Sequence, residues 1–328
     1  MEFIKIEGTG LEVSRIGLGT WAIGGWLWGG TDERESIKTI HAALDSGINL
    51  IDTAPIYGFG VSEEIVGKAI SERKSRSSVI IATKAGIEWR EGKIFRNSSR
   101  DRIRKELEDS LRRLQTDTID IYQIHWPDSQ VPFDETAEVM RELFEEGKIR
   151  AVGLSNFSTA QMDAFRKAAT VHTVQPPYNL FERGIEKELL PYVREQGIAT
   201  LMYGSLCRGL LSGRMASDTV FEGDDLRRVD PKFRPPRFGQ HIRAVEALDE
   251  FAQKNFGKRV IHLAVRWILS RCDRAVALWG ARRPEQLEAV GGALGWSLDN
   301  EAMEQIDKII DEHVWDPIGP EFMAPPDR

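Results

Sequence analysis

Short apolar runs alternate with longer amphipathic segments along the whole chain. Of all the features of the sequence, this alternation limits the possible folds most strongly. Turn or polar residues close each run, and helix-like segments separate most of the runs. Such a pattern is typical of βα units around a parallel sheet. The apolar runs are Arg15–Gly19, Ile48–Asp52, Val79–Lys84, Ile119–His125, Ala151–Ser155, Thr173–Gln175, Ala199–Tyr203 and Ala275–Trp279. Eight such runs predict an α/β fold, a closed (β/α)8 TIM barrel rather than an open doubly wound sheet.

Further elements extend the barrel. Phe3–Ile6 and Leu11–Ser14 flank a Gly8-Thr9-Gly10 turn, which predicts an N-terminal hairpin. A loop of about thirty-five residues precedes Gln240 and is long enough to suggest a functional role. No linker divides the chain, so residues 1–328 are expected to form a single barrel domain with extra helices. Helical periodicity covers Glu33–Asp45, a segment opening at Ser62, Ser99–Leu114, Phe133–Glu146, Ala160–Ala168, Glu186–Gln196, Ile242–Lys254 and Val260–Ser270.

Composition narrows the possible partners. The net charge of −7 argues against a general nucleic-acid binder. No apolar run is long enough to span a bilayer, and the N-terminus lacks the features of a signal peptide, so no membrane partner is expected. Cys207 and Cys272 are too few for a disulfide framework and lack metal-ligand spacing, which suits a cytoplasmic protein without a metal. A monomer or weak oligomer is expected.

Polar residues at the predicted strand ends test the barrel hypothesis. The chemistry of such barrels lies at the carboxyl ends of the strands. The residues at or just past those ends are Asp52, Lys84, His125, Ser155, Asn156, Gln175, Tyr203 and the stretch Gly280-Ala281-Arg282. Because seven strands place polar residues at the same rim, the sequence predicts an active site there.

Three of these positions, together with Tyr57 in the loop after Asp52, suggest acid catalysis on a carbonyl group. Asp52 ends a buried strand and requires a cation, which Lys84 on the adjacent strand can supply. Lys84 would also lie near Tyr57 and lower the pKa of its phenol, which suits a general acid. His125 would donate a hydrogen bond to the carbonyl oxygen. Each residue taken singly has a structural explanation, as a turn cap, a loop aromatic, a snorkelling lysine or a core histidine, but together at one rim they favour catalysis.

Two stretches are candidates for binding a phosphate. Gly17-Leu18-Gly19-Thr20-Trp21-Ala22 matches a dinucleotide fingerprint, but Trp26-Leu27-Trp28 follows where that motif requires a helix, so we reject it as a Rossmann site. Gly280-Ala281-Arg282-Arg283-Pro284 is the better candidate. It leads from a strand into a predicted helix with Pro284 in the first turn, where free amides and two guanidinium groups can meet an anion. The two arginines favour NADPH over NADH through its 2′-phosphate.

These motifs together resemble the aldo-keto reductases over nearly the whole chain. The ending Gly319-Pro320-Glu321-Phe322-Met323-Ala324-Pro325-Pro326 resembles the bacterial general-stress branch of that family rather than its mammalian aldose-reductase branch. The matching stretches are Gly17-Leu18-Gly19-Thr20-Trp21, Asp52-Thr53-Ala54-Pro55-Ile56-Tyr57-Gly58, Thr83-Lys84, Gln123-Ile124-His125-Trp126-Pro127-Asp128, Gly153-Leu154-Ser155-Asn156-Phe157, Gln175-Pro176-Pro177-Tyr178-Asn179 and Gly280-Ala281-Arg282-Arg283-Pro284-Glu285-Gln286-Leu287.

The resemblance implies an NADPH-dependent, reversible reduction of aldehydes or ketones, with the tetrad Asp52, Tyr57, Lys84 and His125 and with Tyr57 as proton donor. It implies that Ser155, Asn156 and Gln175 hold the nicotinamide carboxamide, that Tyr203 stacks on the ring, and that Ser205, Leu206, Arg208 and Gly213 contact the pyrophosphate. The implied cofactor set also includes Gly19, Thr20, Trp21, Asp52, Gly280, Arg282 and Gln286. Ala289-Val290 stands where many relatives have Glu-Asn, so an adenine contact expected there is absent.

The substrate is expected to be a small carbonyl compound, because the loops above the barrel are rich in aromatic residues. The rim consists of Trp21, Trp26, Trp28, Phe59, Trp89 and Trp126, and the predicted substrate contacts are Trp21, Trp28, Tyr57, Trp89, His125 and Trp126. The basic residues Arg227, Arg228, Lys232, Arg234 and Arg237 either clamp the cofactor or belong to a solvated loop. Two alternatives remain: a nucleotide-binding regulatory or redox-sensing barrel with little turnover, and a barrel whose tetrad is inherited and unused.

Overall fold

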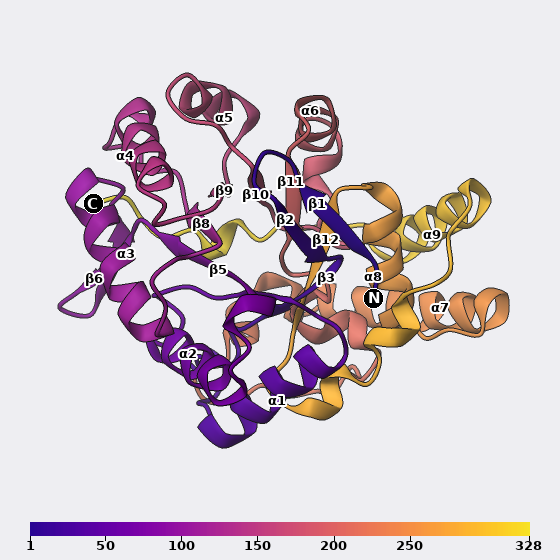
Figure 1. Ribbon diagram of the computed structural model, residues 1–328. Coiled ribbons are helices and arrows are strands. Elements are labelled where there is room, and N and C mark those ends of the chain that lie inside the picture. Colours follow the sequence, from indigo (N-terminus) through magenta and orange to yellow (C-terminus); the bar gives the residue numbers. More distant parts are fainter.

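The computed structural model describes residues 1–328 and contains a closed barrel of parallel strands surrounded by helices (Figure 1). Around the barrel the strands follow the order β10-β11-β12-β3-β4-β5-β8-β9, so the predicted (β/α)8 architecture is confirmed. The strands are β3 (Ile16–Gly19), β4 (Leu50–Asp52), β5 (Ile80–Ala85), β8 (Ile121–Ile124), β9 (Val152–Ser155), β10 (Thr173–Gln175), β11 (Ala199–Met202) and β12 (Ala275–Gly280). Almost every residue in them is buried, as expected of strands covered on both faces.

An N-terminal hairpin closes one end of the barrel. It pairs β1 (Phe3–Ile6) with β2 (Leu11–Ser14), as predicted, and lies in front of the barrel in Figure 1. Ile6, Leu11 and Val13 of this hairpin join one apolar cluster with inward-facing strand residues such as Leu50 and Ile121. Because this plug covers the amino ends of the strands, only the carboxyl end remains open for a ligand.

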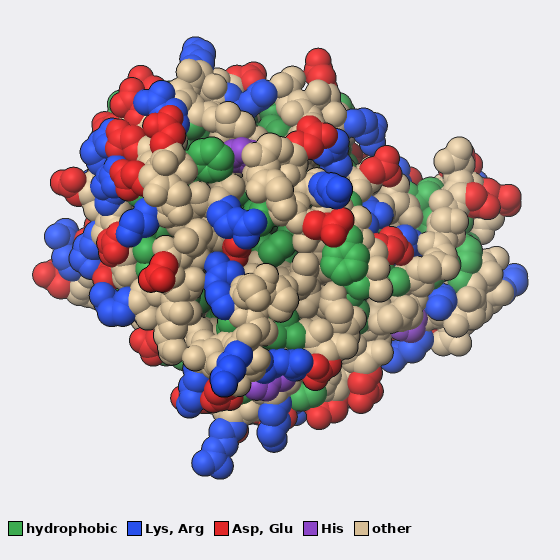
Figure 2. Space-filling view, viewed as in Figure 1, with side chains coloured by type: hydrophobic (Ala, Val, Ile, Leu, Met, Phe, Trp, Pro, Cys, Tyr) green, Lys and Arg blue, Asp and Glu red, His purple; other side chains and the backbone are tan.

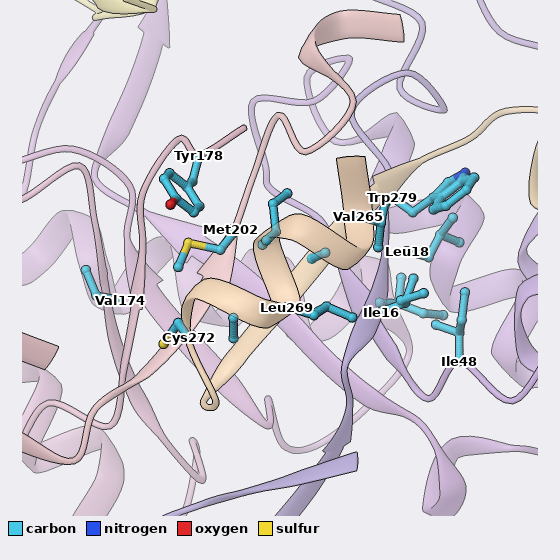
Figure 3. Packing of buried hydrophobic residues seen from close by; sticks show 14 of the residues in the cluster. Ile16, Leu18, Ile48, Val174, Tyr178, Met202, Val265, Leu269, Cys272 and Trp279 are labelled. Atoms are coloured by element: carbon cyan, nitrogen blue, oxygen red, sulfur yellow. The ribbon is translucent and has the colours of Figure 1, made fainter. Parts of the chain in front are cut away.

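Helices cover the outside of the barrel through apolar faces. Figure 3 shows Val265 and Leu269 of α8 near Ile16 and Leu18 of β3, and all four belong to the main buried cluster. Burial of one such side chain contributes about 1.5–3 kcal/mol. The helices are α1 (Glu33–Asp45), α2 (Val61–Arg73), α3 (Arg100–Leu114), α4 (Phe133–Glu145), α5 (Thr159–Arg166), α6 (Leu189–Gln196), α7 (Arg237–Phe256), α8 (Val260–Arg271) and α9 (Asn300–His313).

The segment between β11 and α7 is more ordered than predicted. Three 3₁₀ turns, η3 (Cys207–Ser212), η4 (Leu226–Arg228) and η5 (Pro231–Phe233), interrupt it. α7 begins at Arg237, five residues before the predicted start at Ile242. Its first turn is polar except for Phe238, which is buried, and this polarity hid the helix in the sequence pattern.

Two further elements differ from prediction. A second hairpin, β6 (Ile87–Arg90) with β7 (Lys93–Arg96), follows β5 and was not predicted; its turn, Glu91-Gly92, has positive φ at both residues, as a tight hairpin requires. The predicted helix after β12 is wrong: Pro284 opens only η6 (Pro284–Leu287), and η7 (Val290–Ala293) follows. A Cβ on Gly292 would lie 2.5 Å from His262 Nε2, so the second of these turns packs closely on α8.

The C-terminal segment after α9 crosses the open end of the barrel. In Figure 1 it runs from α9, behind the barrel, to the edge that carries β6. Lys232 Nζ donates hydrogen bonds of 3.1 Å to the carbonyl oxygens of both Ile318 and Gly319, and Arg96 binds Pro325 and Pro326 at the other end. The 3₁₀ turn η8 (Glu321–Met323) lies between these anchors.

The molecular surface mixes both signs of charge. On the face that carries β1 and β2, acidic and basic side chains are interspersed without a large apolar area (Figure 2). No helix combines the length and apolarity that a membrane crossing demands.

Candidate active site

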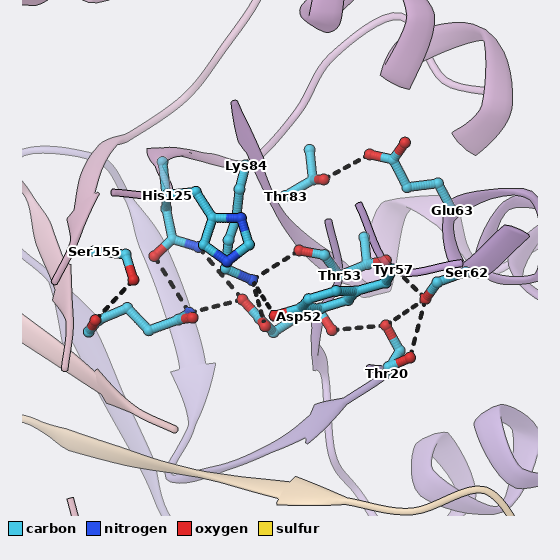
Figure 4. Close-up of polar contacts among 12 residues, drawn as sticks. Thr20, Asp52, Thr53, Tyr57, Ser62, Glu63, Thr83, Lys84, His125 and Ser155 are labelled. Carbon is cyan, nitrogen blue, oxygen red and sulfur yellow. Dashed lines mark hydrogen bonds and ion pairs between the residues drawn. The ribbon is translucent and has the colours of Figure 1, made fainter. Parts of the chain in front are cut away.

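A buried lysine, Lys84, is hydrogen-bonded to two of the other three predicted catalytic residues (Figure 4). Lys84 Nζ, on β5, lies 2.8 Å from Asp52 Oδ2 at the end of β4 and donates to Tyr57 Oη at 3.2 Å. A third donor bond, of 2.8 Å, reaches the carbonyl oxygen of Thr53. Lys84 is fully buried and Asp52 nearly so. The carboxylate, the ammonium group and the phenol therefore form one continuous hydrogen-bonded chain.

Two glutamine amides hold the second oxygen of Asp52. Gln175 Nε2 donates to Asp52 Oδ1 at 2.7 Å, and Gln123 Nε2 donates to the same atom at 3.3 Å. Gln175 was expected to bind the cofactor carboxamide, and Gln123 was not among the predicted site residues. Gln123 lies two residues before His125 on a buried strand, a spacing that places both on one face, so a signal for it was present.

The loop after β4 brings Tyr57 over the barrel, with His125 beside it. The rings of Tyr57 and His125 meet edge to face, with centroids 5.9 Å apart, and Trp21 stacks on the other side of Tyr57 at 5.9 Å. Glycines allow this position, because a Cβ on Gly58 would lie 2.1 Å from the carbonyl oxygen of Gly24. Gly58 also has a φ of +69°, which favours glycine. The Tyr57 hydroxyl and the His125 ring thus lie in one wall.

The electrostatic environment of Tyr57 differs from the one predicted. Burial, with a smaller effect of the Asp52 charge, raises the pKa of Tyr57 well above its usual value, whereas a lowered pKa was expected. The reason is that the phenol is buried and that the Asp52 carboxylate, paired with the charged Lys84, offsets the attraction of the ammonium for a phenolate. Tyr57 is consequently protonated at neutral pH, the form that can donate a proton.

Burial also shifts the two basic groups. It lowers the pKa of Lys84, although Asp52 opposes this shift. The pKa of His125 lies well below its usual value, because the ring is buried and the Lys84 ammonium is near. His125 is therefore neutral at pH 7 and can use a ring N–H as a hydrogen-bond donor.

A network of hydroxyl groups supports the loop that carries Tyr57. Thr20 Oγ1 donates to the Asp52 carbonyl oxygen at 2.9 Å, and Ser62 Oγ bridges Thr20 Oγ1 at 2.7 Å and Thr53 Oγ1 at 2.9 Å (Figure 4). All these hydroxyl groups are buried. Because buried hydrogen bonds are costly to break, they fix the end of β4 relative to β3 and α2.

Two cavities meet at Tyr57. The long cavity, of about 640 Å³, extends from Tyr57 past β12 toward α8, and the short cavity, of about 320 Å³, opens beside His125 and Trp126. Trp21, Tyr57, Tyr203 and Met323 line both cavities. A reactive group in one cavity can therefore face a reactive group in the other across the phenol of Tyr57.

The long cavity contains most of the residues assigned to the cofactor. They are Gly19, Thr20, Trp21, Asp52, Tyr203, Ser205, Leu206, Arg208, Gly280 and Gln286. Gly213 and Arg282 do not line it, and Ser155, Asn156 and Gln175 line the short cavity instead. Asn156 has a φ of +63°; its amide donates to the His125 carbonyl oxygen at 3.0 Å and its Oδ1 accepts from Tyr203 Oη at 2.9 Å.

The stretch from Gly280 to Pro284, after β12, does not form the anion site that was expected there. The amides of Arg282 and Arg283 donate to Gln286 Oε1 at 2.9 and 3.1 Å, so they are not free as predicted. The Arg282 guanidinium donates to the Trp28 carbonyl oxygen. The four-residue η6 turn is too short to present the row of free amides that a longer helix would.

The basic residues after β11 also have partners within the protein. Arg208 forms ion pairs with Glu182 and, at 2.5 Å, with Asp230, and Lys232 lies 2.8 Å from Glu182. All four are buried. Arg227 pairs with Asp225, and Arg237 with Asp316. Arg208 and Arg227 nevertheless line the long cavity, whereas Lys232 ties the loop to the C-terminal segment.

The short cavity is apolar and includes residues that sequence analysis did not identify. Trp21, Trp26 and Trp126 of the predicted aromatic rim line it, together with Tyr57 and His125. Trp28 lines only the long cavity; Trp89 lines neither and packs on Phe59, with ring centroids 5.7 Å apart. The additional lining residues are Leu27, Ile56, Ile87, Ile94, Leu226, Val229, Phe322, Met323, Pro325 and Pro326.

The long cavity suits a nicotinamide dinucleotide chemically. The indole N–H groups of Trp21 and Trp28 are buried in its wall without a hydrogen-bond partner, which is unusual for a buried donor. Arg214 and Arg259 line its distal part and form no ion pair within the protein. The aromatic surface near Tyr57 suits the flat nicotinamide ring, and the cationic groups farther along the cavity suit the phosphate groups.

Comparisons with known proteins agree with this geometry. A sequence model described as the aldo/keto reductase family matches residues 15–311. The aldo-keto reductase YhdN of Bacillus subtilis is 60% identical over 328 residues, covering 100% of this chain and 99% of that protein. The NADH-specific methylglyoxal reductase of Escherichia coli is 37% identical, covering 92% of this chain and 95% of its own. The glycerol dehydrogenase AKR11B4 from Gluconobacter oxydans has 52% identity and a TM-score of 0.89, with coverage of 98% and 99%.

Proposed function

The chain belongs to the aldo/keto reductase family of oxidoreductases, and from this premise we propose that it catalyses the reversible, NADPH-dependent reduction of aldehydes and ketones to alcohols. The observation that carries the proposal is the hydrogen-bonded chain from Asp52 through Lys84 to Tyr57 at the junction of the two cavities. The substrate carbonyl occupies the short cavity, and the dinucleotide occupies the long cavity. When bound, the reduced nicotinamide supplies the hydride for the carbonyl carbon.

Tyr57 is the general acid in this proposal. Its raised pKa keeps the phenol protonated until a carbonyl oxygen gains negative charge. The Lys84 ammonium, 3.2 Å from the phenol oxygen, stabilises the phenolate as the proton leaves. Asp52 keeps Lys84 charged despite its burial. Neutral His125 donates a hydrogen bond to the same carbonyl oxygen and sets the direction from which it meets Tyr57.

The long-cavity residues named above form the proposed cofactor site. Tyr203 lines both cavities at their junction and donates to Asn156 Oδ1 at 2.9 Å, and Ser155, Asn156 and Gln175 line the short cavity at this point. The preference for NADPH rests on cationic groups toward the distal end, Arg214 and Arg259, rather than on Arg282, whose guanidinium is bonded to Trp28. Glu285 and Glu288 lie in the same lining, so the preference is expected to be moderate.

The proposal is tested by following NADPH absorbance with a panel of aldehydes for wild type and Tyr57→Phe. We expect turnover by wild type and a loss of about 10²–10⁴-fold in kcat for the variant, the usual contribution of a general acid. Cofactor binding, measured by fluorescence titration, should be unchanged, because the ring of Tyr57 remains. Slow, substrate-independent turnover would instead support a redox sensor, and no binding of either nucleotide would overturn both functions. Equal affinity for NADH and NADPH would overturn the cofactor preference alone.

A further inference from the structure

The short cavity cannot by itself accommodate a charged substrate. Its lining contains no Asp, Glu, Lys or Arg, and His125 is neutral at pH 7. A charged group enclosed there would lose its hydration without gaining a partner of opposite charge. Any charge on a carbonyl substrate must therefore lie outside this cavity, at a distance from the reacting carbon.

A basic recess lies directly beside the short cavity. It is a cavity of about 430 Å³ lined by Arg90, Lys93, Ile94, Phe95, Pro326, Asp327 and Arg328. Ile94 and Pro326 line both it and the short cavity, so the two spaces have a common wall. The backbone of Arg96 donates to the Pro326 carbonyl oxygen at 3.0 Å, which holds hairpin β6–β7 against the C-terminal segment that builds this wall. Figure 1 shows the chain end and β6 at the same edge of the molecule.

The recess carries excess positive charge. Three cationic side chains face one acidic side chain, Asp327, whose carboxylate is 3.3 Å from Arg96 and accepts a hydrogen bond from Ser129. Arg328 lies 3.5 Å from Asp128. Arg90 and Lys93 have no carboxylate within 4.0 Å; the Arg90 guanidinium lies over the Phe95 ring. Both side chains are exposed, so they are available for an external anion.

We propose that the basic recess binds the anionic end of a carbonyl substrate whose aldehyde group lies beside Tyr57. The preferred substrate class is then an aldehyde with an uncharged spacer and a distal carboxylate or phosphate ester. This inference rests on the proposed reductase function and names the substrate class of the same site. Both anions offer oxygen atoms to Arg90 and Lys93, and a guanidinium group can bind either of them through two hydrogen bonds.

The test compares matched anionic and neutral aldehydes. Formyl carboxylates of increasing chain length are assayed beside their methyl esters, and phosphorylated hydroxyaldehydes beside the unphosphorylated compounds. Wild type is expected to show a higher kcat/KM for the anion at one chain length, the length that reaches the recess. Arg90→Gln and Lys93→Gln should each lower the anion-to-neutral ratio about 1.5- to 5-fold, as for exposed ion pairs. Lys93→Glu should lower it further, and high salt should remove the preference in wild type.

Controls separate this proposal from the reductase function. Lys254→Gln, on the exposed surface of α7, removes one positive charge elsewhere and should leave the ratio unchanged. If the variants reduce neutral aldehydes like wild type and keep the anion ratio, the recess proposal is overturned and the reductase function stands. If no aldehyde is reduced, the reductase function fails, and the recess is then tested by the binding of a hydroxy carboxylate, measured by isothermal titration calorimetry. Weaker binding by Lys93→Gln would support the recess, and equal binding would overturn it.

Discussion

Lys84 Nζ lies 2.8 Å from Asp52 Oδ2, and this ion pair is buried inside the barrel with almost no exposed surface. The partners belong to adjacent parallel strands, β4 and β5, so the pair joins the two strands at the level of the active site. A buried ion pair is costly to form, and removing one partner leaves the other charge without compensation. The pair therefore links catalysis to stability.

Lys84→Met is expected to lower kcat by at least about 100-fold, because Tyr57 loses the cation that stabilises its phenolate. It should also lower the free energy of unfolding by about 3–5 kcal/mol, since Asp52 is left buried and unpaired. The double variant Asp52→Asn/Lys84→Met removes both charges and should regain most of the stability without activity. Urea unfolding and aldehyde turnover measure the two effects. A stable, inactive single variant would contradict the proposed energetic role of the pair.

Gln123 is expected to act as a positioning residue for Asp52. Gln123→Leu removes the 3.3 Å hydrogen bond to Asp52 Oδ1 and should reduce kcat by roughly 5- to 30-fold, with KM for the aldehyde nearly unchanged. Without this donor Asp52 is held less firmly against the Lys84 ammonium, so the alkaline limb of the kcat profile should move. Tyr122, the neighbouring residue on β8, offers a control, because its hydroxyl bonds the Ile103 carbonyl oxygen outside the barrel. Tyr122→Phe should lose stability but retain the wild-type pH profile.

Gly153 has no side chain, and the side chain of Gln123 occupies the space that one would fill. A Cβ at this position would lie 2.6 Å from Gln123 Cγ and 2.5 Å from Thr173 Oγ1. Gly153→Ala is therefore expected to destabilise the fold by about 1–3 kcal/mol, as overpacked cores do, and to lower kcat by displacing Gln123. Thermal unfolding and aldehyde turnover provide the measurements. Gly291→Ala, where an added Cβ meets no atom within 4 Å, is the matched control.

Glu106 is expected to make stability depend on pH. Burial raises its pKa from an ordinary 4.5 to about 7, although Arg102 and the Gly86 amide oppose this shift. The folded protein thus holds the proton more tightly than the unfolded chain. This contribution to stability is complete below about pH 4.5 and is lost as the pH rises to about 7. Glu106→Gln is uncharged throughout, so the stability of wild type relative to this variant should fall by up to about 3 kcal/mol between pH 5 and 8. The free energies of unfolding are measured with urea at each pH. A difference between wild type and Glu106→Gln that stays constant from pH 5 to 8 would disprove this titration.

Arg96 is expected to control substrate affinity through the C-terminal segment. Its side chain donates to the carbonyl oxygens of Pro325 and Pro127 at 2.8 and 2.9 Å, and Pro325 lines the short cavity. Arg96→Met removes both bonds and should raise KM for small aldehydes about 10-fold, the effect of losing one or two hydrogen bonds. Turnover at saturation should change little, because the tetrad is untouched. Arg141→Met, on the exposed face of α4, is the control and should leave KM unchanged. Faster proteolysis of the C-terminal segment in Arg96→Met, but not in Arg141→Met, would show that the change in KM comes from loosening of this segment.

Local pattern was sufficient to predict the barrel and the position of its active site. Alternating apolar runs identify the strands, and parallel topology brings the carboxyl ends of all strands to one rim. Asp52, Lys84 and His125 were therefore predicted to lie near one another before any contact was known. The hairpin β6–β7 was missed because its strands are short and only partly buried, so they lack the apolar run that marks a barrel strand.

The hydrogen-bond partners of the long polar side chains depended on the tertiary structure. Gln286 bonds the amides of Arg282 and Arg283, Lys232 binds carbonyl groups 86 and 87 residues away, and Gln175 bonds a carboxylate 123 residues away. The raised pKa of Tyr57 likewise depends on burial beneath loops distant in sequence. By itself the sequence determined which residues stand at the rim, because strand periodicity is local. Only the tertiary structure decided what each residue contacts, because a flexible side chain can bond only to groups that folding brings within its reach. Burial in the folded protein then shifts the pKa values and so decides which side chains are charged.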